Sequence, residues 1–531
     1  MNEKIQDFLS WHIYQIYPRS FCDSNGDGIG DLAGVLSKLD YLKSLGVNAI
    51  WLCPCYKSPN VDNGYDVSDY RDIMPEFGTL EDMRNLIEAM HKRNMKLIMD
   101  LVPNHTSDQH VWFQESRKSR SNPYSDYYYW FDSVPNDWQS CFGGSAYTFD
   151  AVRGQYYLHS YAPQQPDLNW DNPEVVKQMQ SVVDFWVDMG VDGFRIDVID
   201  QISKDFPGNQ NCFGPHLHEY IRALFGREKT KHLFTVGECW AQDIEEVRRH
   251  CAADRQELST LFQFDHLEVG REGKFQRKPD SLRSLWKILS GWQTTMQQEE
   301  LLYSLFTDNH DNGWLLDRIG SKENRYGSAT CLAAMVYLLR GVSFLYQGQE
   351  FGMCNSSHDT IEAFDDVESI NLYPVLCESI PPEEALARIN FGSRDNTRHP
   401  MCWSDAHGAG FTEGMPWMAL HADYKAWNLK QDLSGEQSVF RFYQALLSLK
   451  AEHPALTLGT FEDLTPDCAS FCLFRRKYKN ESVLVACNFE AENEIVLPVT
   501  AEAFLFGNFR TDSAKDYFHL PYEITVWTEK N

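Results

Sequence analysis

The sequence has no long hydrophobic run and few basic residues relative to acidic ones. Its longest apolar stretch, 329–339, ends at Arg340 and is too short to cross about 30 Å of hydrocarbon. The first twenty residues lack the basic start and the uninterrupted apolar block of a signal peptide. The 48 Lys and Arg residues against 76 Asp and Glu give a net charge of −28, which repels phosphate backbones and anionic lipids. We therefore expect a soluble, cytoplasmic protein with no nucleic acid or membrane partner.

Cysteine pairs of the CxxC type are also missing. The fourteen cysteines are scattered along the chain, and Cys53 and Cys55 form the closest pair. Reduced, mostly buried thiols in a cytoplasm are the simpler interpretation. The length of 531 residues excludes a single small module and leaves room for a large core with additional domains.

Eight short apolar runs recur along the chain, and each one ends at polar residues. Helical periodicity over 80–94, 175–189 and 328–339 occupies three of the intervals between them. Eight strand–helix units in succession predict an α/β fold of the (β/α)8 TIM barrel type. The predicted strands are 12–18, 49–54, 96–102, 191–198, 233–238, 261–266, 303–311 and 343–350.

Two long intervals and a change of pattern divide the chain further. The segment 104–172, after the third strand, is too long for a barrel loop and is predicted to be an inserted domain B over the C-terminal face of the barrel. A second subdomain is predicted near 355–422. Alternating short runs without helices predict a C-terminal antiparallel β-sandwich domain over 455–531. The barrel itself then comprises 1–103 and 173–454.

Acidic residues stand where four predicted strands end: Asp100, Asp197, Glu238 and Asp311. Barrel enzymes place their reactive groups at these ends. A lone carboxylate in such a position commonly caps the next helix, but four converging ones favour a site. Arg195 precedes Asp197 by two residues on an alternating strand, so it should point to the same side and hold that carboxylate ionised.

Several converging carboxyl groups suit the cleavage of a glycosidic bond. One carboxylic acid protonates the leaving oxygen, and one carboxylate acts at the anomeric carbon. A third raises the pKa of the acid by like-charge repulsion and binds sugar hydroxyls. A metal-dependent carboxylate cluster is the alternative. The nearby arginine and the lack of a third histidine favour acid–base glycosyl chemistry.

Five ordered blocks resemble the α-amylase superfamily, and the resemblance covers essentially the whole chain. The blocks are DLVPNH (100–105), QPDLNW (165–170), GFRIDV (193–198), TVGE (235–238) and NHD (309–311). The resemblance implies that Asp197 is the nucleophile, Glu238 the general acid/base and Asp311 the transition-state stabiliser. It also implies a substrate-binding group around the terminal sugar, formed by Asp100, His105, Arg195 and His310.

A closer similarity is to the oligo-1,6-glucosidase and dextran glucosidase branch. DNGYDVSDY (62–70) matches a block in which Asp62 and Tyr65 line the closed end of the pocket, and SRDNTRHPMCW (393–403) places Arg398 beside Asp62. Val198 after the nucleophile is typical of α-1,6-preferring members, because a β-branched side chain narrows the site of the leaving sugar. A valine that only fills the core is the alternative.

This branch implies a retaining exo-acting α-glucosidase, a monomer or small homo-oligomer, that removes terminal α-1,6-linked glucose from short oligosaccharides such as isomaltose. Cleavage of α-1,4 linkages stays open. Trehalose-6-phosphate hydrolase and sucrose isomerase or transglucosidase share the scaffold and are the alternatives, whereas a non-catalytic interaction barrel would lack the carboxylates. Trp240 and Trp314, near the acceptor side, could each be a stacking platform for the leaving sugar or pack locally.

The motif DSNGDGIGD (23–31) predicts a cation site. Oxygen atoms alternate around glycine turns as in the first nine positions of an EF-hand loop. The twelfth position is glycine instead of glutamate, which disfavours an EF-hand sensor. Resemblance to the branch implies a structural Ca²⁺ or Mg²⁺ in this loop, and an empty turn is the alternative. The candidate ligands are Asp23, Asn25, Asp27, the Ile29 carbonyl and Asp31.

Overall fold

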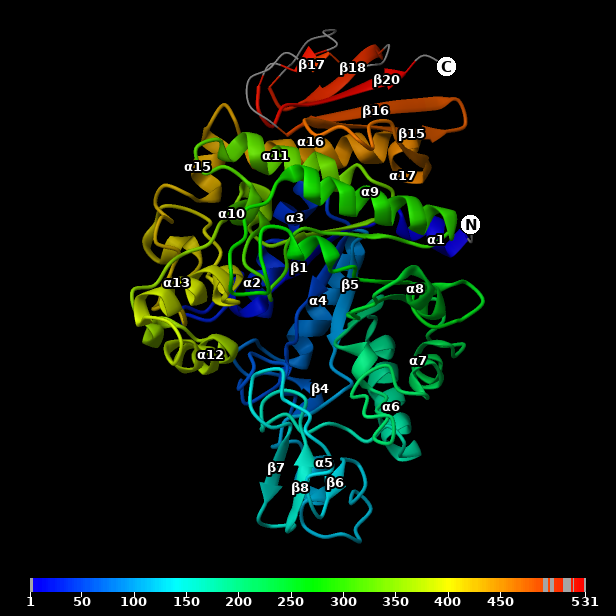
Figure 1. The fold of residues 1–531 in the computed structure, drawn as a ribbon, viewed down its shortest axis with the longest axis vertical. Coiled ribbons are helices and arrows are strands. Elements are labelled where there is room, and N and C mark those ends of the chain that lie inside the picture. The colour runs from blue at the N-terminus through cyan, green and yellow to red at the C-terminus, as the bar shows by residue number, and fades with distance from the viewer. Residues whose placement is uncertain (1–2, 490–494, 497–500, 510–516, 519, 530–531) are drawn as a thin grey trace.

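The computed structural model describes residues 3–489, 495–496, 501–509, 517–518 and 520–529. Its centre is one sheet of eight parallel strands in the order β11-β10-β9-β5-β2-β1-β13-β12, which curls into a nearly closed barrel (Figure 1). The TIM-barrel prediction is therefore confirmed. The strands are β1 (His12–Ile16), β2 (Ala49–Leu52), β5 (Lys96–Leu101), β9 (Gly193–Ile196), β10 (Phe234–Gly237), β11 (Thr260–Leu261), β12 (Ser304–Leu305) and β13 (Val342–Tyr346).

The barrel has one seam, between β11 and β12, where side chains take the place of a backbone ladder. Thr260 Oγ1 donates to the Leu302 carbonyl at 2.6 Å, and Ser304 Oγ donates to the Leu261 carbonyl at 2.7 Å. Each of these strands has only two residues. The predicted seventh strand, 303–311, is therefore too long, since its second half is a loop that carries polar residues into the pocket.

The helices around the barrel begin and end at the residue types that their termini require. Thr79 and Asp82 form a capping box at the start of α4, and Asn172 caps α6 ahead of its first-turn proline. Gly190 then ends α6 in the left-handed conformation, at φ 108°. The barrel helices are α2 (Leu32–Ser37), α3 (Leu39–Leu45), α4 (Leu80–Lys92), α6 (Pro173–Met189), α7 (Leu217–Phe225), α8 (Ile244–Cys251), α9 (Leu282–Gln298), α10 (Leu315–Ile319), α11 (Arg325–Tyr337) and α16 (Val439–Glu452).

Two insertions stand at the ends of barrel strands. The segment after β5 contains α5 (Val111–Ser116) and a three-stranded antiparallel sheet with its own small aromatic core. The segment after β13 is helical, with α12 (Val367–Cys377), α13 (Pro382–Gly392) and α14 (Asp395–Arg398). The strands of the first insertion are β6 (Trp130–Phe131), β7 (Tyr147–Asp150) and β8 (Gln155–Leu158), and the antiparallel pair β3 (Tyr56–Lys57) and β4 (Asp69–Ile73) precedes it.

The chain ends in an antiparallel sheet of five strands in the order β14-β15-β16-β20-β18, with a separate pair formed by β17 and β19. Figure 1 shows this sheet packed over α11 and α16, at the opposite end of the molecule from β7 and β8. Part of the predicted C-terminal domain, 490–494, 497–500, 510–516 and 519, lies outside the described residues.

Among the helices described, none is long and apolar enough to span a membrane. The remaining elements are β14 (Thr460–Asp463), β15 (Phe471–Tyr478), β16 (Glu481–Asn488), β17 (Ile495–Val496), β18 (Ala501–Gly507), β19 (Tyr517–Phe518), β20 (Ile524–Glu529), α1 (Glu3–Phe8), α15 (Leu429–Ser434) and α17 (Pro454–Leu458).

Candidate active site

Three carboxyl groups from neighbouring strand ends converge on the guanidinium of Arg195. Arg195 Nη1 lies 2.7 Å from Asp100 Oδ1 and 2.8 Å from Asp197 Oδ1, and its Nη2 binds Glu238 Oε2. The guanidinium is buried, with its carbon 5.3 Å from the centre of the Trp51 ring. One cation thus fixes the positions of the three acidic side chains, and it places Asp197 and Glu238 at the two terminal nitrogens of the same group.

The backbone turns sharply between Asp197 and the next residue. Val198 has φ 33° and ψ 50°, a left-handed conformation that is strained for a β-branched residue. In this position its N–H points at Glu238 Oε2, at 3.3 Å, and its side chain lines the pocket. The strained turn therefore presents Asp197 and Val198 side by side to the pocket.

His310 and Tyr65 form a stacked pair against Asp100. Their rings are 5.4 Å apart and nearly parallel, at 9°. The Gln15 amide lies 2.8 Å from His310 Nδ1, which leaves Nε2 to face the Tyr65 hydroxyl at 2.6 Å, and that hydroxyl donates to Asp100 Oδ2 at 3.1 Å. Burial lowers the pKa of His310 to about 3, so the ring is neutral and serves as a hydrogen-bond donor.

Asp311 is held by positive charge and by His310. Arg398 Nη2 binds its Oδ1 at 2.9 Å, and His310 Nε2 lies 3.0 Å from its Oδ2. Burial alone would raise the pKa of Asp311, but His310, Arg398 and Arg394 hold it below its ordinary value. This carboxyl is therefore ionised at any physiological pH.

Asp62 closes one end of the pocket, and its ion-pair partner is Arg394. Arg394 Nη2 lies 3.2 Å from Asp62 Oδ1, while Gln165 Nε2 donates to Asp62 Oδ2 at 3.1 Å. The predicted neighbour, Arg398, instead binds Asp311 and is fully buried behind the pocket wall. His105 stands within 3.2 Å of the same Gln165 amide. The outer polar contacts of a terminal sugar would thus fall to Asp62, Arg394, Gln165 and His105.

Asp197 and Asp100 are buried carboxyl groups that share the single guanidinium of Arg195. Burial raises the pKa of Asp197 well above its ordinary value, Arg195 opposes the rise, and Glu238, Asp100 and Asp311 add to it. Burial likewise raises the pKa of Asp100 to about 6 against the effect of Arg195. Because these carboxyl groups share one guanidinium, their titrations are linked, and burial favours the neutral forms of Asp197 and Asp100.

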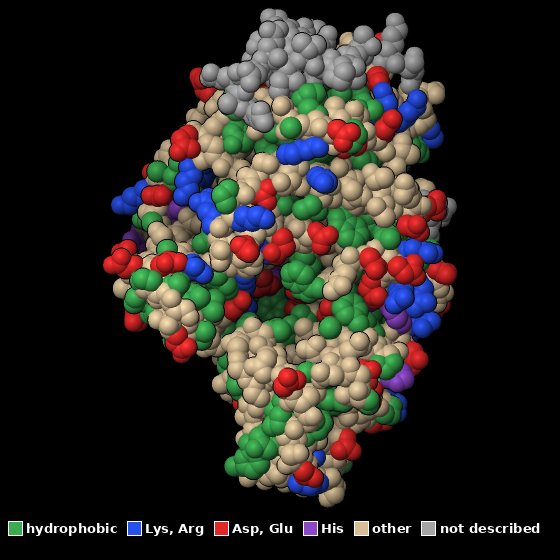
Figure 2. All heavy atoms as spheres, viewed as in Figure 1, with side chains coloured by type: hydrophobic (Ala, Val, Ile, Leu, Met, Phe, Trp, Pro, Cys, Tyr) green, Lys and Arg blue, Asp and Glu red, His purple; other side chains and the backbone are tan. Residues whose placement is uncertain are grey.

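The carboxyl groups open into a cavity of about 480 Å³. Figure 2 shows a hollow at this place, bordered by acidic side chains, where the two insertions approach the barrel. On its outer side Trp240 is 53% exposed and stacks on Phe264, with ring centres 4.7 Å apart. Trp314, in contrast, is 1% exposed and donates from Nε1 to the Asn396 carbonyl at 2.9 Å. Of the two tryptophans, only Trp240 can act as a platform.

Ten of the predicted site residues lie in or around this pocket, and Arg398 stands directly behind it. Three other polar residues of the site were missed, and two of them lie within quoted motifs. Gln165 opens the QPDLNW block and Arg394 lies in the SRDNTRHPMCW block, where a basic residue four positions from Arg398 was the available signal. Asp366, which binds Arg394 Nε at 2.7 Å, comes from the helical insertion and has no such signal in the sequence.

In the loop 23–31, side-chain oxygen atoms accept hydrogen bonds from backbone N–H groups of the same loop. Asp23 Oδ1 accepts from the N–H groups of Asn25 and Gly26 at 2.9 and 2.7 Å, and Asp27 Oδ1 accepts from the Ile29 N–H at 2.8 Å. Asp31 differs, since its Oδ1 accepts from the Gly34 N–H at the start of α2 at 2.6 Å, while its Oδ2 accepts from the Ser24 N–H at 2.9 Å. Oxygen atoms of Asp23, Asn25, Asp27 and Ile29 thus fit a cation loop, whereas Asp31 acts as a helix cap in addition.

Comparison with known proteins agrees with this geometry. Residues 15–459 match the family described as alpha amylase, catalytic domain. An oligo-1,6-glucosidase from Parageobacillus thermoglucosidasius is 41% identical over 97% of both chains. The solved structure of a trehalose-6-phosphate hydrolase from Bacillus licheniformis has a TM-score of 0.91 at 37% identity, over 98% of this chain and 100% of that one. The trehalulose synthase from Pseudomonas mesoacidophila has a TM-score of 0.93 at 37% identity, over 98% and 99%. The chain therefore belongs to the alpha-amylase family.

Proposed function

We propose that the protein is a retaining exo-acting α-glucosidase that removes terminal, non-reducing α-1,6-linked glucose from short oligosaccharides. The observation that carries the proposal is the pairing of Asp197 and Glu238 through Arg195 in a pocket whose far end is closed by the Asp62–Arg394 ion pair. A closed end admits one terminal sugar and leaves the rest of the chain outside. The similarity to oligo-1,6-glucosidases supports the same substrate class.

Asp197 and Glu238 have different roles in the two steps of the reaction. Asp197 attacks the anomeric carbon while Glu238 donates a proton to the leaving glycosidic oxygen, so that a glucosyl ester forms on Asp197 and the aglycone departs. Glu238 then accepts a proton from water, which attacks the same carbon, breaks the ester and releases α-glucose. Attachment to one guanidinium is compatible with the carboxyl separation of about 5–5.5 Å found in retaining enzymes.

The surrounding charges suit an oxocarbenium-like transition state. Asp311 stays ionised because His310 and two arginines stabilise its carboxylate, so it can interact with the developing positive charge and the sugar hydroxyls. The first step requires an ionised Asp197 and a proton on Glu238, where the leaving oxygen arrives.

A neutral acceptor fits the outer pocket better than a phosphorylated one. The two cations on that side are neutralised, since Arg271 binds Glu268 at 2.7 Å and Lys274 binds Glu368 at 2.5 Å. A phosphate group would have to displace one of these carboxylates. This pairing argues against trehalose 6-phosphate as the substrate, despite the similarity of the scaffold to the trehalose-6-phosphate hydrolase.

The test is a substrate panel with product identification. Isomaltose, panose, maltose, sucrose and trehalose 6-phosphate are compared by kcat/KM, and the first-formed anomer is read by proton NMR. The proposal expects α-glucose as the first product, with isomaltose or panose as the best substrate. Initial release of β-glucose would contradict the retaining mechanism. Preferred cleavage of trehalose 6-phosphate, or isomerisation of sucrose as the main reaction, would contradict the substrate assignment.

We also propose a structural Ca²⁺ or Mg²⁺ in the loop 23–31, held by Asp23, Asn25, Asp27 and the Ile29 carbonyl. The support is the chemistry of this donor set, which consists of oxygen atoms only, as these hard cations prefer. A cytoplasmic location is proposed on the ground that all fourteen cysteines are free thiols, nine of them buried. A monomer or small homo-oligomer stays a prediction.

A further inference from the structure

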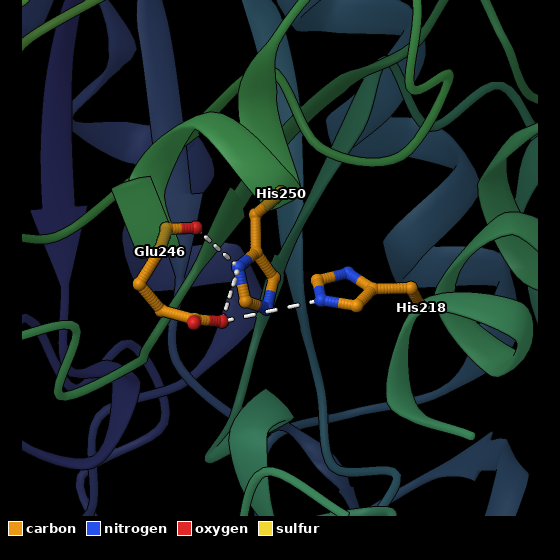
Figure 3. A group of neighbouring side chains, drawn as sticks. All are labelled: His218, Glu246 and His250. Carbon is orange, nitrogen blue, oxygen red and sulfur yellow. Dashed lines mark hydrogen bonds and ion pairs between the residues drawn. The ribbon is translucent and has the colours of Figure 1, made fainter. Parts of the chain in front are cut away.

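Outside the pocket, two histidines and a glutamate gather between α7 and α8. His218 lies on α7, and Glu246 and His250 lie one turn apart on α8 (Figure 3). Glu246 Oε1 is 4.0 Å from His218 Nε2 and 3.3 Å from His250 Nδ1, and one donor atom from each residue lies within 4.8 Å of the others. Two imidazoles and a carboxylate are a ligand set that binds first-row divalent metals.

Each imidazole has one nitrogen occupied by an oxygen acceptor. His218 Nδ1 lies 2.8 Å from Glu257 Oε2, and His250 Nδ1 lies 2.9 Å from the Glu246 carbonyl. These contacts place the proton on Nδ1 in both rings and leave a lone pair on each Nε2. Metal-binding histidines are oriented in the same way, by a carboxylate or carbonyl on the second nitrogen.

The second imidazole carries an unsatisfied atom. His250 is fully buried, yet its Nε2 has no hydrogen-bond partner among the described residues. Figure 3 shows the unbonded side of this ring facing His218. A buried nitrogen without a partner costs stability unless something binds it.

We propose that His218, Glu246 and His250 form a binding site for Zn²⁺. The ion would take Nε2 of both histidines and Oε1 of Glu246, with a water molecule completing four ligands. Arg249 binds Glu246 Oε2 at 3.3 Å and so leaves Oε1 directed at the imidazoles. His218 is 24% exposed, which gives the ion a path from solvent.

The position of the site gives it a structural consequence. Helices α7 and α8 follow β9 and β10, the strands that carry Asp197 and Glu238 to the pocket. An ion bound between these two helices cross-links the elements behind the catalytic pair without touching the substrate. We therefore expect Zn²⁺ to stabilise this side of the barrel and to leave the chemistry unaltered.

Zinc binding to the full-length chain tests the proposal. After treatment with chelator and removal of the chelator, the protein is titrated with Zn²⁺ against a fluorescent zinc indicator, and bound zinc is counted by elemental analysis. The variants are H218Q and E246Q, each of which removes a ligand from a partly exposed position. H216Q is the matched control, because His216 is an exposed histidine at the start of the same helix, α7, and lies outside the cluster. E257Q neutralises the carboxylate that orients His218 and that also pairs with Arg255 at 3.0 Å, while it leaves the three ligands in place.

The wild-type chain and H216Q should each bind one more zinc ion than H218Q or E246Q. Zinc should raise the melting temperatures of the wild-type chain and H216Q, but not those of H218Q and E246Q. E257Q should fold and bind zinc about 10–100-fold more weakly, as expected when the group that orients a ligand is lost. The proposal is overturned if the wild-type chain binds no zinc at micromolar concentration. It is equally overturned if H218Q and E246Q bind as much zinc as H216Q, since the ion would then lie at another site.

Discussion

Replacing Val198 by alanine should move the linkage preference of the enzyme toward maltose. Val198 follows the nucleophile, is 7% exposed and lines the pocket beside Glu238. We expect an α-1,4-linked leaving sugar to lie directly against this side chain, whereas the additional methylene of an α-1,6 linkage should allow the ring to swing away. The backbone N–H that faces Glu238 Oε2 is retained in the variant, so the acid/base keeps this contact.

The size of the effect follows from the two methyl groups that V198A removes. A contact of this size changes discrimination by about 1–3 kcal/mol, or roughly 10- to 200-fold in the ratio of kcat/KM values. The loss of burial, at about 0.8 kcal/mol for each CH₂, limits the destabilisation to about 2 kcal/mol. The assay compares kcat/KM for maltose and isomaltose, and p-nitrophenyl α-glucoside, which has no leaving sugar, serves as the internal reference.

V198G provides the matched control for backbone strain. Glycine adopts φ 33° without the penalty of a β-branched residue, so V198G relieves the strain and opens the same space. Both variants should raise the maltose-to-isomaltose ratio, but only V198G should recover stability. An unchanged ratio in both would show that Val198 is a packing residue. A change in V198G alone would refute the steric argument and assign the effect to the backbone.

Four further outcomes are expected. D197N should abolish turnover, whereas E238Q should keep the first step on substrates with good leaving groups, seen as a burst of released phenol; equal loss in both would contradict the assigned roles. D27A should lower the metal content and the melting temperature, and chelator should not lower the melting temperature of this variant further. An unchanged melting curve would show that the loop is a simple turn without a metal. W240A should raise KM for panose more than KM for p-nitrophenyl α-glucoside, and the difference should correspond to a loss of about 0.5–1.5 kcal/mol of binding free energy. An equal rise in both KM values would show that Trp240 is not a stacking platform for the leaving sugar. Burial raises the pKa of Glu350 to about 7 despite hydrogen bonds from two tyrosines, so the folded chain holds a proton that the unfolded chain loses above pH 4.5. Stability should therefore fall as the pH rises from about 4.5 to 7, by up to about 3 kcal/mol, and E350Q should flatten this dependence in denaturant titrations.

The barrel could be predicted because each strand is a buried apolar run that stops at polar residues. The predicted runs 12–18 and 96–102 agree closely with β1 and β5. The ends of the shortest barrel strands, β11 and β12, were predicted less accurately, because the apolar run continues into loop residues that are buried against the pocket. The inserted segment was identified by its length and composition, but its strand pairing depends on contacts between distant residues such as Tyr147 and Leu158.

The acidic residues of the site could be predicted from their places at strand ends, because a parallel barrel gathers all such ends on one face. Their individual partners could not. The choice between Arg394 and Arg398 for Asp62 depends on how a four-residue helix, α14, is turned against the barrel. Trp240 and Trp314 have equal chemistry in the sequence, and only the packing of their loops makes one exposed and the other buried.

The seam between β11 and β12 is the weakest contact between neighbouring strands of the barrel. Parting these strands breaks two hydroxyl-to-carbonyl bonds, worth about 0.5–1.5 kcal/mol each, whereas parting other neighbours breaks a backbone ladder. Local opening should begin here, and amide exchange should be fastest in Thr260–Leu261 and Ser304–Leu305 among the barrel strands. Asp311 follows β12, whereas Asp197 and Glu238 directly follow the better paired β9 and β10. Opening of the seam should therefore loosen the stabilising carboxylate and leave the reacting pair in place.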